Sequence, residues 1–415
     1  MPRGRSRYGS IEPIDGLPAV VDGLGTSGAA VSSITGQFPP VSVCAVGRLG
    51  AHCPIEEEGF LEKIVRRGAL WVIVAILTST AIPATVLATY ADRRASPLVV
   101  AYHIDTDQES LTTLLTHGDQ IHWVITTNFA IVDSSGRLDG VHNPALVEVV
   151  HRLGSEVHFR VANFVRRDWS RKVAHAVVTQ PSSRRMAITQ ILHALDAYGY
   201  DGVNLDLENV PPEDRVSLST FVGDVSDAVH ARGKTVTIAV PATTHDVPEN
   251  SWAGAFDLAT LGRLCDAVIV MAYDQHWSTS TPGPVAALPW VEDVIRYAAG
   301  EVGRHKVLLG LAFYGYDWPQ RGRGVGVSMR EAMKRALRQK AQVRWDQDAR
   351  VPYFTTKTRT VYFENARSIE HKLDLATRYG LAGIAAWRLG QELDDVWDAV
   401  SAYAGSQPAA ARPSR

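Results

Sequence analysis

The stretch Asp201–Glu208, with the sequence DGVNLDLE, decides the fold and points to the chemistry. Side chains on a β-strand alternate between two faces, so the three apolar residues share one face while Asn204, Asp206 and Glu208 share the other. An ordinary core strand gains nothing from two carboxylates about 7 Å apart on one face, because burying charge is costly. A catalytic strand can use them as a general acid and a neighbour that holds the substrate. A solvated strand end is the alternative, so the rest of the chain has to decide.

Strand-like and helical segments alternate on both sides of this stretch. The expected strands are residues 98–104, 121–126, 157–162, 201–208, 235–240, 267–273, 307–313 and 383–387. The expected helices are residues 108–115, 144–153, 184–198, 211–231, 258–264, 289–300 and 369–379. This alternation predicts an α/β fold, a (β/α)8 TIM barrel. An open doubly wound sheet is the alternative, but no Gly-x-Gly-x-x-Gly motif follows the first strand to support a nucleotide-binding fold.

The segment after the seventh strand is too long for a plain loop. We expect residues 315–365 to form a small α+β insertion, with a helix over 329–340 and short strands over 343–345, 353–355 and 360–363. Such an insertion would form one wall of a cleft at the rim of the barrel.

A segment without charged residues, from Gly68 to Ala91, precedes the barrel pattern. It is long enough to cross about 30 Å of hydrocarbon as a helix, and a slight excess of flanking positive charge before it favours a cytoplasmic N-terminus. A cleaved signal peptide is the alternative, but the 67 residues before it are too many. We therefore expect a disordered cytoplasmic tail over 1–66, a single transmembrane helix over 67–91, an extracytoplasmic barrel over 95–405 and a disordered tail over 406–415.

Composition narrows the class of protein. Hydrophobic residues make up 46% and charged residues 21% of the 415 residues, as in a globular protein. The formal net charge of −2 argues against a nucleic-acid partner. Three cysteines cannot build a disulfide framework, and Cys44, His52 and Cys53 lack a fourth ligand at a useful spacing. We expect neither a metal site nor a cofactor.

Aromatic and acidic residues also stand at the ends of other expected strands. Tyr273 and Asp274 end the sixth strand, Tyr314 follows the seventh and Trp387 ends the eighth. The catalytic groups of a barrel come from the C-terminal ends of its strands, so these residues should lie near Glu208. Each aromatic residue could belong to the core, but their presence at several strand ends favours a sugar site.

These motifs resemble glycoside hydrolase family 18, the chitinase-like hydrolases. The stretch Asp201–Glu208 is similar to its fourth-strand signature, and Met271–Asp274 and Trp387 match its sixth and eighth strands. The runs 273–277, 282–285, 288–290, 314–318 and 364–368 resemble the spore-germination and peptidoglycan-associated branch. The opening strands more weakly resemble family 18 domains fused to polysaccharide deacetylases and glycosyltransferases. The resemblance covers roughly residues 97–403.

The resemblance implies a role for each matched residue. Glu208 would be the general acid and then the base, Asp206 would hold the substrate N-acetyl group, and Tyr273 would bind the acetamido oxygen. In this substrate-assisted route that oxygen attacks the anomeric carbon in place of an enzyme nucleophile. The residues expected to bind substrate are Asn204, Asp274, Trp387, Tyr102, Tyr314 and Trp277, with Trp387 as the floor of the cleavage subsite.

Asn204 departs from the family pattern, which has aspartate at this position. An aspartate would repel Asp206 and raise its pKa, whereas an amide removes the repulsion and can still donate a hydrogen bond to Asp206. We expect activity to survive, on a different substrate or at a lower rate. Asp201 lies off the catalytic face, and we expect it to shape the start of the strand.

The sequence therefore predicts a membrane-anchored glycosidase that cleaves a β-linked, N-acetylglucosamine-containing polysaccharide. Chitin-like polymers, peptidoglycan and poly-N-acetylglucosamine all remain open as substrates, as do endo or exo action and the oligomeric state. The first alternative is a non-catalytic carbohydrate-binding barrel of the cell envelope, and the second is a structural envelope protein. Lectin-like family members usually lose the acid, whereas this chain keeps Glu208.

Overall fold

The computed structural model describes residues 96–406. The predicted tail over 1–66, the predicted membrane helix over 67–91, the Cys44–Cys53 segment and residues 407–415 lie outside the described residues. Within residues 96–406, no helix has the length and apolar character that crossing a membrane requires.

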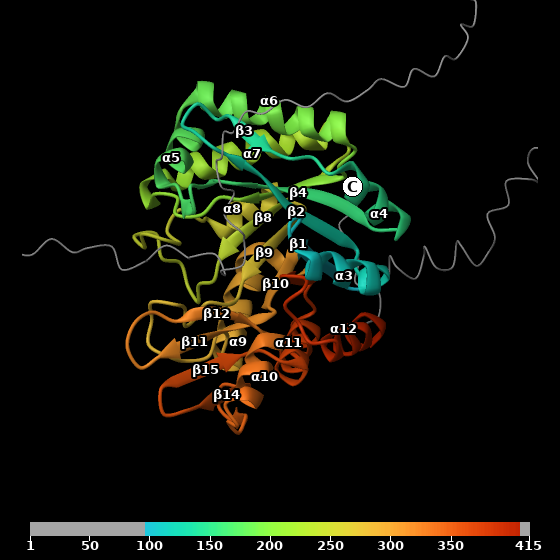
Figure 1. The fold of residues 1–415 in the computed structure, drawn as a ribbon. Helices are drawn as coiled ribbons and strands as arrows, with labels where there is room; N and C mark the ends of the chain where they lie inside the picture. The colour runs from blue at the N-terminus through green and yellow to red at the C-terminus, as the bar shows by residue number, and fades with distance from the viewer. Residues whose placement is uncertain (1–95, 407–415) are drawn as a thin grey trace, which may run out of the picture. The chain divides into compact units, whose positions relative to one another are not determined.

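Eight parallel strands form a closed barrel, drawn as the central arrows of Figure 1. The ring closes because β1 pairs in parallel with both β2 and β16. An open sheet would leave two unpaired edges, so the predicted barrel is confirmed and the doubly wound alternative is wrong. The barrel strands are β1 (Leu98–His103), β2 (Trp123–Ile131), β4 (Glu156–Ala162), β7 (Gly202–Asp206), β8 (Thr235–Pro241), β9 (Ala267–Met271), β10 (Val307–Ala312) and β16 (Gly383–Trp387).

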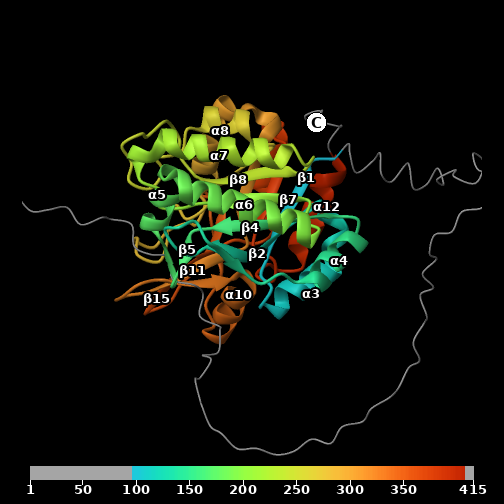
Figure 2. The same ribbon diagram turned by 90° about the horizontal axis from the view of Figure 1, so that it is seen from above.

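Helices surround the barrel, as the view from above in Figure 2 shows. They are α3 (Gln108–His117), α4 (Pro144–Arg152), α5 (Arg171–Thr179), α6 (Pro181–Tyr198), α7 (Arg215–His230), α8 (Leu258–Leu264), α9 (Leu288–Ala298), α11 (Ala366–Tyr379) and α12 (Asp395–Ser406). Helices α5 and α12 were not predicted from the sequence. Pro212–Asp214, predicted as part of α7, forms a separate 3₁₀ turn. Proline starts α6, and Gly199 ends it with a φ of 74°, which glycine adopts without strain.

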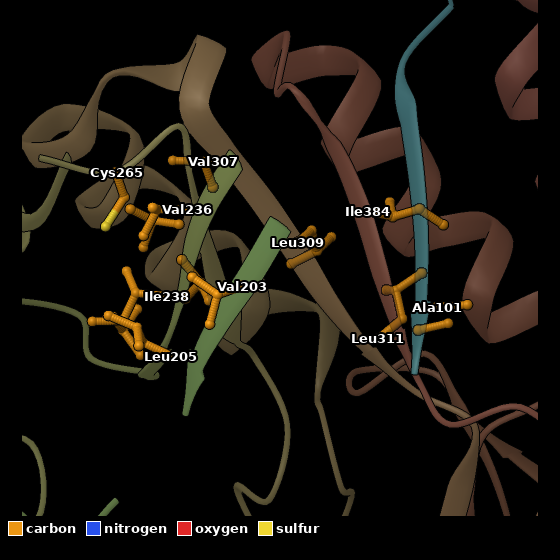
Figure 3. Packing of buried hydrophobic residues seen from close by; sticks show 14 of the residues in the cluster. Ala101, Val203, Leu205, Val236, Ile238, Cys265, Val307, Leu309, Leu311 and Ile384 are labelled. Carbon is orange, nitrogen blue, oxygen red and sulfur yellow. The ribbon is translucent and has the colours of Figure 1, made fainter. Parts of the chain in front are cut away.

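The two faces of β7 have different surroundings, as its alternating pattern predicts. Val203 and Leu205 are fully buried in the layer between the barrel and the helices, where Figure 3 shows them near Val236 and Ile238 of β8. Asn204 points the other way, into the barrel, and bonds to Tyr102 of β1. The apolar face therefore holds the barrel to its helices, and the polar face is turned into the barrel.

The segment after β10 folds as the predicted α+β insertion, seen in orange and red at the lower edge of Figure 1. Its five-stranded antiparallel sheet has the order β12-β11-β15-β14-β13. Its elements are β11 (Tyr314–Pro319), β12 (Val325–Ser328), α10 (Met329–Arg338), β13 (Arg344–Asp346), β14 (Val351–Thr355) and β15 (Arg359–Phe363). Asp317 is fully buried and forms ion pairs with Arg335 and Arg359, with nitrogen–oxygen distances of 2.5 Å. These pairs join β11 to α10 and β15.

Two short hairpins follow the second and third barrel strands. β3 (Leu138–Gly140) pairs with the end of β2, which runs five residues further than predicted. β5 (Phe164–Val165) pairs with β6 (Asp168–Trp169) directly after β4. This second hairpin therefore stands at the C-terminal end of the barrel strands, beside the end of β7.

Candidate active site

Two carboxyl groups lie buried at the end of β7. Asp206 ends the strand, and Glu208 follows it in the loop, with 5% and 7% of their surfaces exposed. Burial raises the pKa of Glu208 well above its ordinary value, and the charge of Asp206 raises it further. These effects favour the protonated carboxyl group that a general acid needs.

An arginine on the neighbouring strand holds Asp206. Arg160 of β4 donates from Nη1 to Oδ2 of Asp206 at 3.1 Å, and its side chain is 12% exposed. Burial raises the pKa of Asp206, and Arg160 opposes that rise. The other oxygen of Asp206, Oδ1, is buried without a hydrogen-bond partner among the described residues. The ion pair therefore fixes one oxygen and leaves the second free to accept a bond.

The same arginine lies between two indole rings. Its guanidinium carbon is 5.8 Å from the centre of the Trp387 ring and 6.0 Å from that of Trp169. Tyr102 meets Trp387 edge to face, with 5.1 Å between the ring centres. Arg160 thus links Asp206 to the aromatic residue predicted to form the floor of the cleavage subsite.

Asn204 does not donate to Asp206, so that expectation is wrong. Its Nδ2 donates to Oγ1 of Thr237 at 2.9 Å, and its Oδ1 accepts from the Tyr102 hydroxyl at 3.1 Å. Both ends of the amide are occupied by neighbouring strands, while Arg160 takes the position beside Asp206. The partner of Asp206 is therefore a cation on the next strand.

The backbone of Glu208 is held by a buried amide. Asn163, just after β4, accepts from the Glu208 N–H at 2.9 Å and donates to its carbonyl oxygen at 2.8 Å. The following residue, Asn209, has a φ of 56°, so the chain turns sharply there. Asn163 thereby fixes the backbone position from which the Glu208 side chain extends.

A second cluster contains the predicted residues from the sixth and seventh strands. Asp274 accepts from the hydroxyl of Tyr314 at 2.5 Å and from that of Tyr316 at 3.2 Å. Burial raises the pKa of Asp274 to about 6. Tyr273 and Trp277 pack against the same aromatic group, which also touches Trp387.

The Asp206–Glu208 pair and the cluster around Asp274 are close enough to interact electrostatically. Burial raises the pKa of Tyr273 well above its ordinary value, and the charges of Asp206, Asp274 and Glu208 add to that effect. The structure therefore brings together all nine residues predicted for the site. Asp201 lies apart at the start of β7, as expected, where it accepts from the Val157 N–H and pairs with His151 at 2.7 Å.

Comparison with known proteins places the chain in a family. The model named "Glycosyl hydrolases family 18" matches residues 168–392, more than half of the chain. The chain belongs to glycosyl hydrolases family 18. The predicted resemblance and the predicted glycosidase class are thereby confirmed.

Individual relatives of this family 18 chain come from Bacillus subtilis (strain 168). YdhD is 31% identical over 239 residues, which cover 55% of this chain and 56% of that protein. The cortical fragment-lytic enzyme is 28% identical over 247 residues, covering 57% of each chain. This chain thus spans just over half the length of both relatives. A solved structure, the chitinase from Chromobacterium violaceum ATCC 12472, has 29% identity and a TM-score of 0.69, with 75% of this chain and 100% of that chain covered.

Three residues of this family 18 site were not predicted from the sequence: Arg160, Asn163 and Trp169. A signal for Arg160 was present, because Glu156, His158 and Arg160 form a polar alternating row on the strand before β7. Asn163 and Trp169 gave no such signal, since only the tertiary pairing of β4, β7 and the β5–β6 hairpin brings them to Glu208.

Proposed function

We propose that this chain hydrolyses the glycosidic bond of a β-linked glycan containing N-acetylglucosamine, with retention of the anomeric configuration. The observation that carries the proposal is the pairing of two differently placed carboxyl groups. Glu208 is buried in an environment that favours its protonated form, whereas Asp206 is bound by Arg160 with one oxygen free. Two carboxyl groups whose environments separate their pKa values are the usual sign of an acid and its partner.

In the first step Glu208 donates its proton to the glycosidic oxygen as the bond to the anomeric carbon breaks. The carbonyl oxygen of the substrate acetamido group attacks that carbon and forms a cyclic oxazolinium intermediate. The free oxygen of Asp206 accepts the acetamido N–H, which stabilises the positive charge of the ring. The Tyr273 hydroxyl donates to the acetamido oxygen and fixes its direction of attack.

In the second step the Glu208 carboxylate takes a proton from water, and the water oxygen attacks the anomeric carbon. The ring opens, the acetamido group is restored and Glu208 is protonated again. Trp387 stacks on the sugar at the cleavage point, and Asp274 with Tyr314 binds its hydroxyl groups. Two displacements at one carbon give net retention.

The proposal is tested with a matched pair of oligosaccharides. The full-length chain is incubated with an N-acetylglucosamine oligomer and with the same oligomer after removal of its acetyl groups. Products are measured by mass spectrometry and their anomeric form by NMR. Cleavage of only the acetylated oligomer with retention supports the mechanism. Equal cleavage of both oligomers would exclude it, and tight binding without cleavage would favour a carbohydrate-binding barrel.

We also propose that residues 67–91 anchor the enzyme in the membrane with the barrel outside. The support is the uncharged segment Gly68–Ala91 and its flanking charges. A reporter enzyme that works only outside the cytoplasm, fused after Arg415, should be active. A reporter active only in the cytoplasm would contradict this topology.

A further inference from the structure

Two arginines occupy an unusual turn beside the site. Arg166 and Arg167 form the two-residue loop between β5 and β6, are exposed, and have φ values of 52° and 66°. A two-residue hairpin loop with positive φ at both positions is a type I′ turn, which strongly prefers Asn-Gly. Residues other than glycine whose backbone is held at positive φ cluster at functional sites. The conformation of the turn therefore does not account for the two arginines.

The base of this hairpin is attached to the segment that carries Glu208. The Asn163 amide bonds both to the Glu208 carbonyl oxygen, at 2.8 Å, and to the Ser170 carbonyl oxygen, at 3.2 Å. Asn209 donates to the Trp169 carbonyl oxygen at 3.1 Å. The turn is two to three residues further along the hairpin, or roughly 7–10 Å at 3.4 Å per residue. The arginines therefore lie on a hairpin whose base is bonded to the segment that carries Glu208.

The hairpin turn and the start of α5 carry an excess of positive charge. Residues 166–172 read RRDWSRK in a chain whose net charge is −2: the hairpin contributes Arg166, Arg167 and Asp168, and the first turn of α5 adds two more basic residues. Arg171 is already engaged, because it pairs with Glu213 at 3.8 Å and donates to the Asn209 side chain at 3.3 Å and to the Ser251 carbonyl oxygen at 3.2 Å. Among residues 96–406, neither Arg166 nor Arg167 forms an ion pair. Their positive charge is available to a ligand.

We propose that Arg166 and Arg167 form a subsite that binds carboxylate groups carried by the glycan. The planar guanidinium group matches a carboxylate with two parallel hydrogen bonds. This subsite gives the enzyme a preference for a carboxylate-bearing N-acetylated glycan over a neutral one, and it rests on the proposed function. The carboxylate belongs either to a substituent on a sugar ring or to a peptide attached to the glycan.

The test replaces the two arginines with the residues that the turn prefers, Arg166→Asn with Arg167→Gly. This change removes both charges and relieves the backbone, so the melting temperature should stay the same or rise. The control is Arg152→Asn with Arg232→Asn. It removes the same charge at the opposite end of the barrel, where His151, next to Arg152, pairs with Asp201 at the start of β7.

The readout is the ratio of kcat/KM for a carboxylate-bearing glycan to that for a neutral N-acetylglucosamine oligomer of equal length. The ratio should fall about three- to tenfold in the hairpin variant, as expected for two exposed ion pairs, and stay unchanged in the control. Comparing a peptide-bearing glycan with the same glycan stripped of peptides identifies which carboxylate is bound. An unchanged ratio in the hairpin variant, or an equal fall in the control, would overturn the proposal.

Failure of the proposed function gives a different result, because the parent chain would then cleave none of these glycans. In that case the carboxylate-bearing glycan and the neutral oligomer are labelled with a fluorophore, and their dissociation constants are measured. The hairpin variant should lose affinity for the carboxylate-bearing glycan three- to tenfold more than for the neutral one. Equal affinity of the parent chain for both glycans would overturn the subsite.

Discussion

Replacing Arg160 with methionine tests how the protein keeps a buried charge at Asp206. Methionine retains much of the apolar stem between Trp169 and Trp387 but removes the cation 3.1 Å from Asp206. Breaking a buried ion pair by removing one partner typically lowers the free energy of unfolding by about 3–5 kcal/mol. Arg160 is 12% exposed and Asp206 has a side chain that is 7% exposed, so solvent screens the pair weakly.

The loss should depend on pH. Arg160 opposes the rise in the pKa of Asp206 and of Glu208, so its removal raises both values further. An acid whose pKa is higher in the folded protein than in the unfolded chain contributes stability at low pH and loses it as the pH rises past its unfolded value, about 4. Arg160→Met should therefore cost little near pH 4 and the full amount near pH 8.

The assay is urea denaturation followed by tryptophan fluorescence at both pH values, with Arg160→Lys as the control that keeps the charge. The lysine variant should recover most of the stability at pH 8. Turnover of Arg160→Met should fall at neutral pH, because a protonated Asp206 accepts the substrate N–H less well. A loss of stability that is the same at both pH values, or below about 1 kcal/mol at pH 8, would refute the reasoning.

Two further predictions concern the groups around Glu208. Asn163→Ala leaves the Glu208 N–H and carbonyl oxygen without their partner, so the free energy of unfolding should fall by about 1–3 kcal/mol for each buried group left unpaired. The turnover rate should fall as well. A denaturation curve equal to that of the parent would show that Asn163 does not hold the Glu208 backbone in place. Asp274→Asn removes an acid whose pKa burial raises to about 6, and asparagine tolerates the φ of 57° at this position. The parent should lose up to about 3 kcal/mol of stability between pH 4 and pH 6 that the variant does not lose, and equal slopes for both proteins in that window would contradict the assignment.

Alternation along single strands made much of the site predictable. The period-2 pattern of residues 201–208 placed Asn204, Asp206 and Glu208 on one face, and the residues at other strand ends followed from the barrel topology. Contacts between strands were not predictable in this way. The position of Arg160 beside Asp206 depends on the register of β4 against β7, in which Arg160 pairs with Asn204.

The elements that were not predicted differ in how readable they are in the sequence. Helix α5 is rich in β-branched valine, which has a low helix propensity, and only its Ser170 cap, bonded to the Val173 N–H, marks its start. Helix α12 was predictable from the sequence but was not predicted: Val396, Trp397, Val400 and Tyr403 recur at helical spacing, and all four are buried. The β5–β6 turn contradicts the usual turn residues, so sequence rules for hairpins do not find it.

The central claim is that Glu208 supplies the proton that breaks the glycosidic bond. Glu208→Gln keeps the shape of the side chain and removes that proton. Initial rates on an N-acetylated oligomer are measured at neutral pH, together with the dissociation constant of the same oligomer. The rate should fall about 10²- to 10⁴-fold while the oligomer still binds, because Trp387 and Asp274 are untouched. A variant that turns over the oligomer at the rate of the parent would contradict the claim.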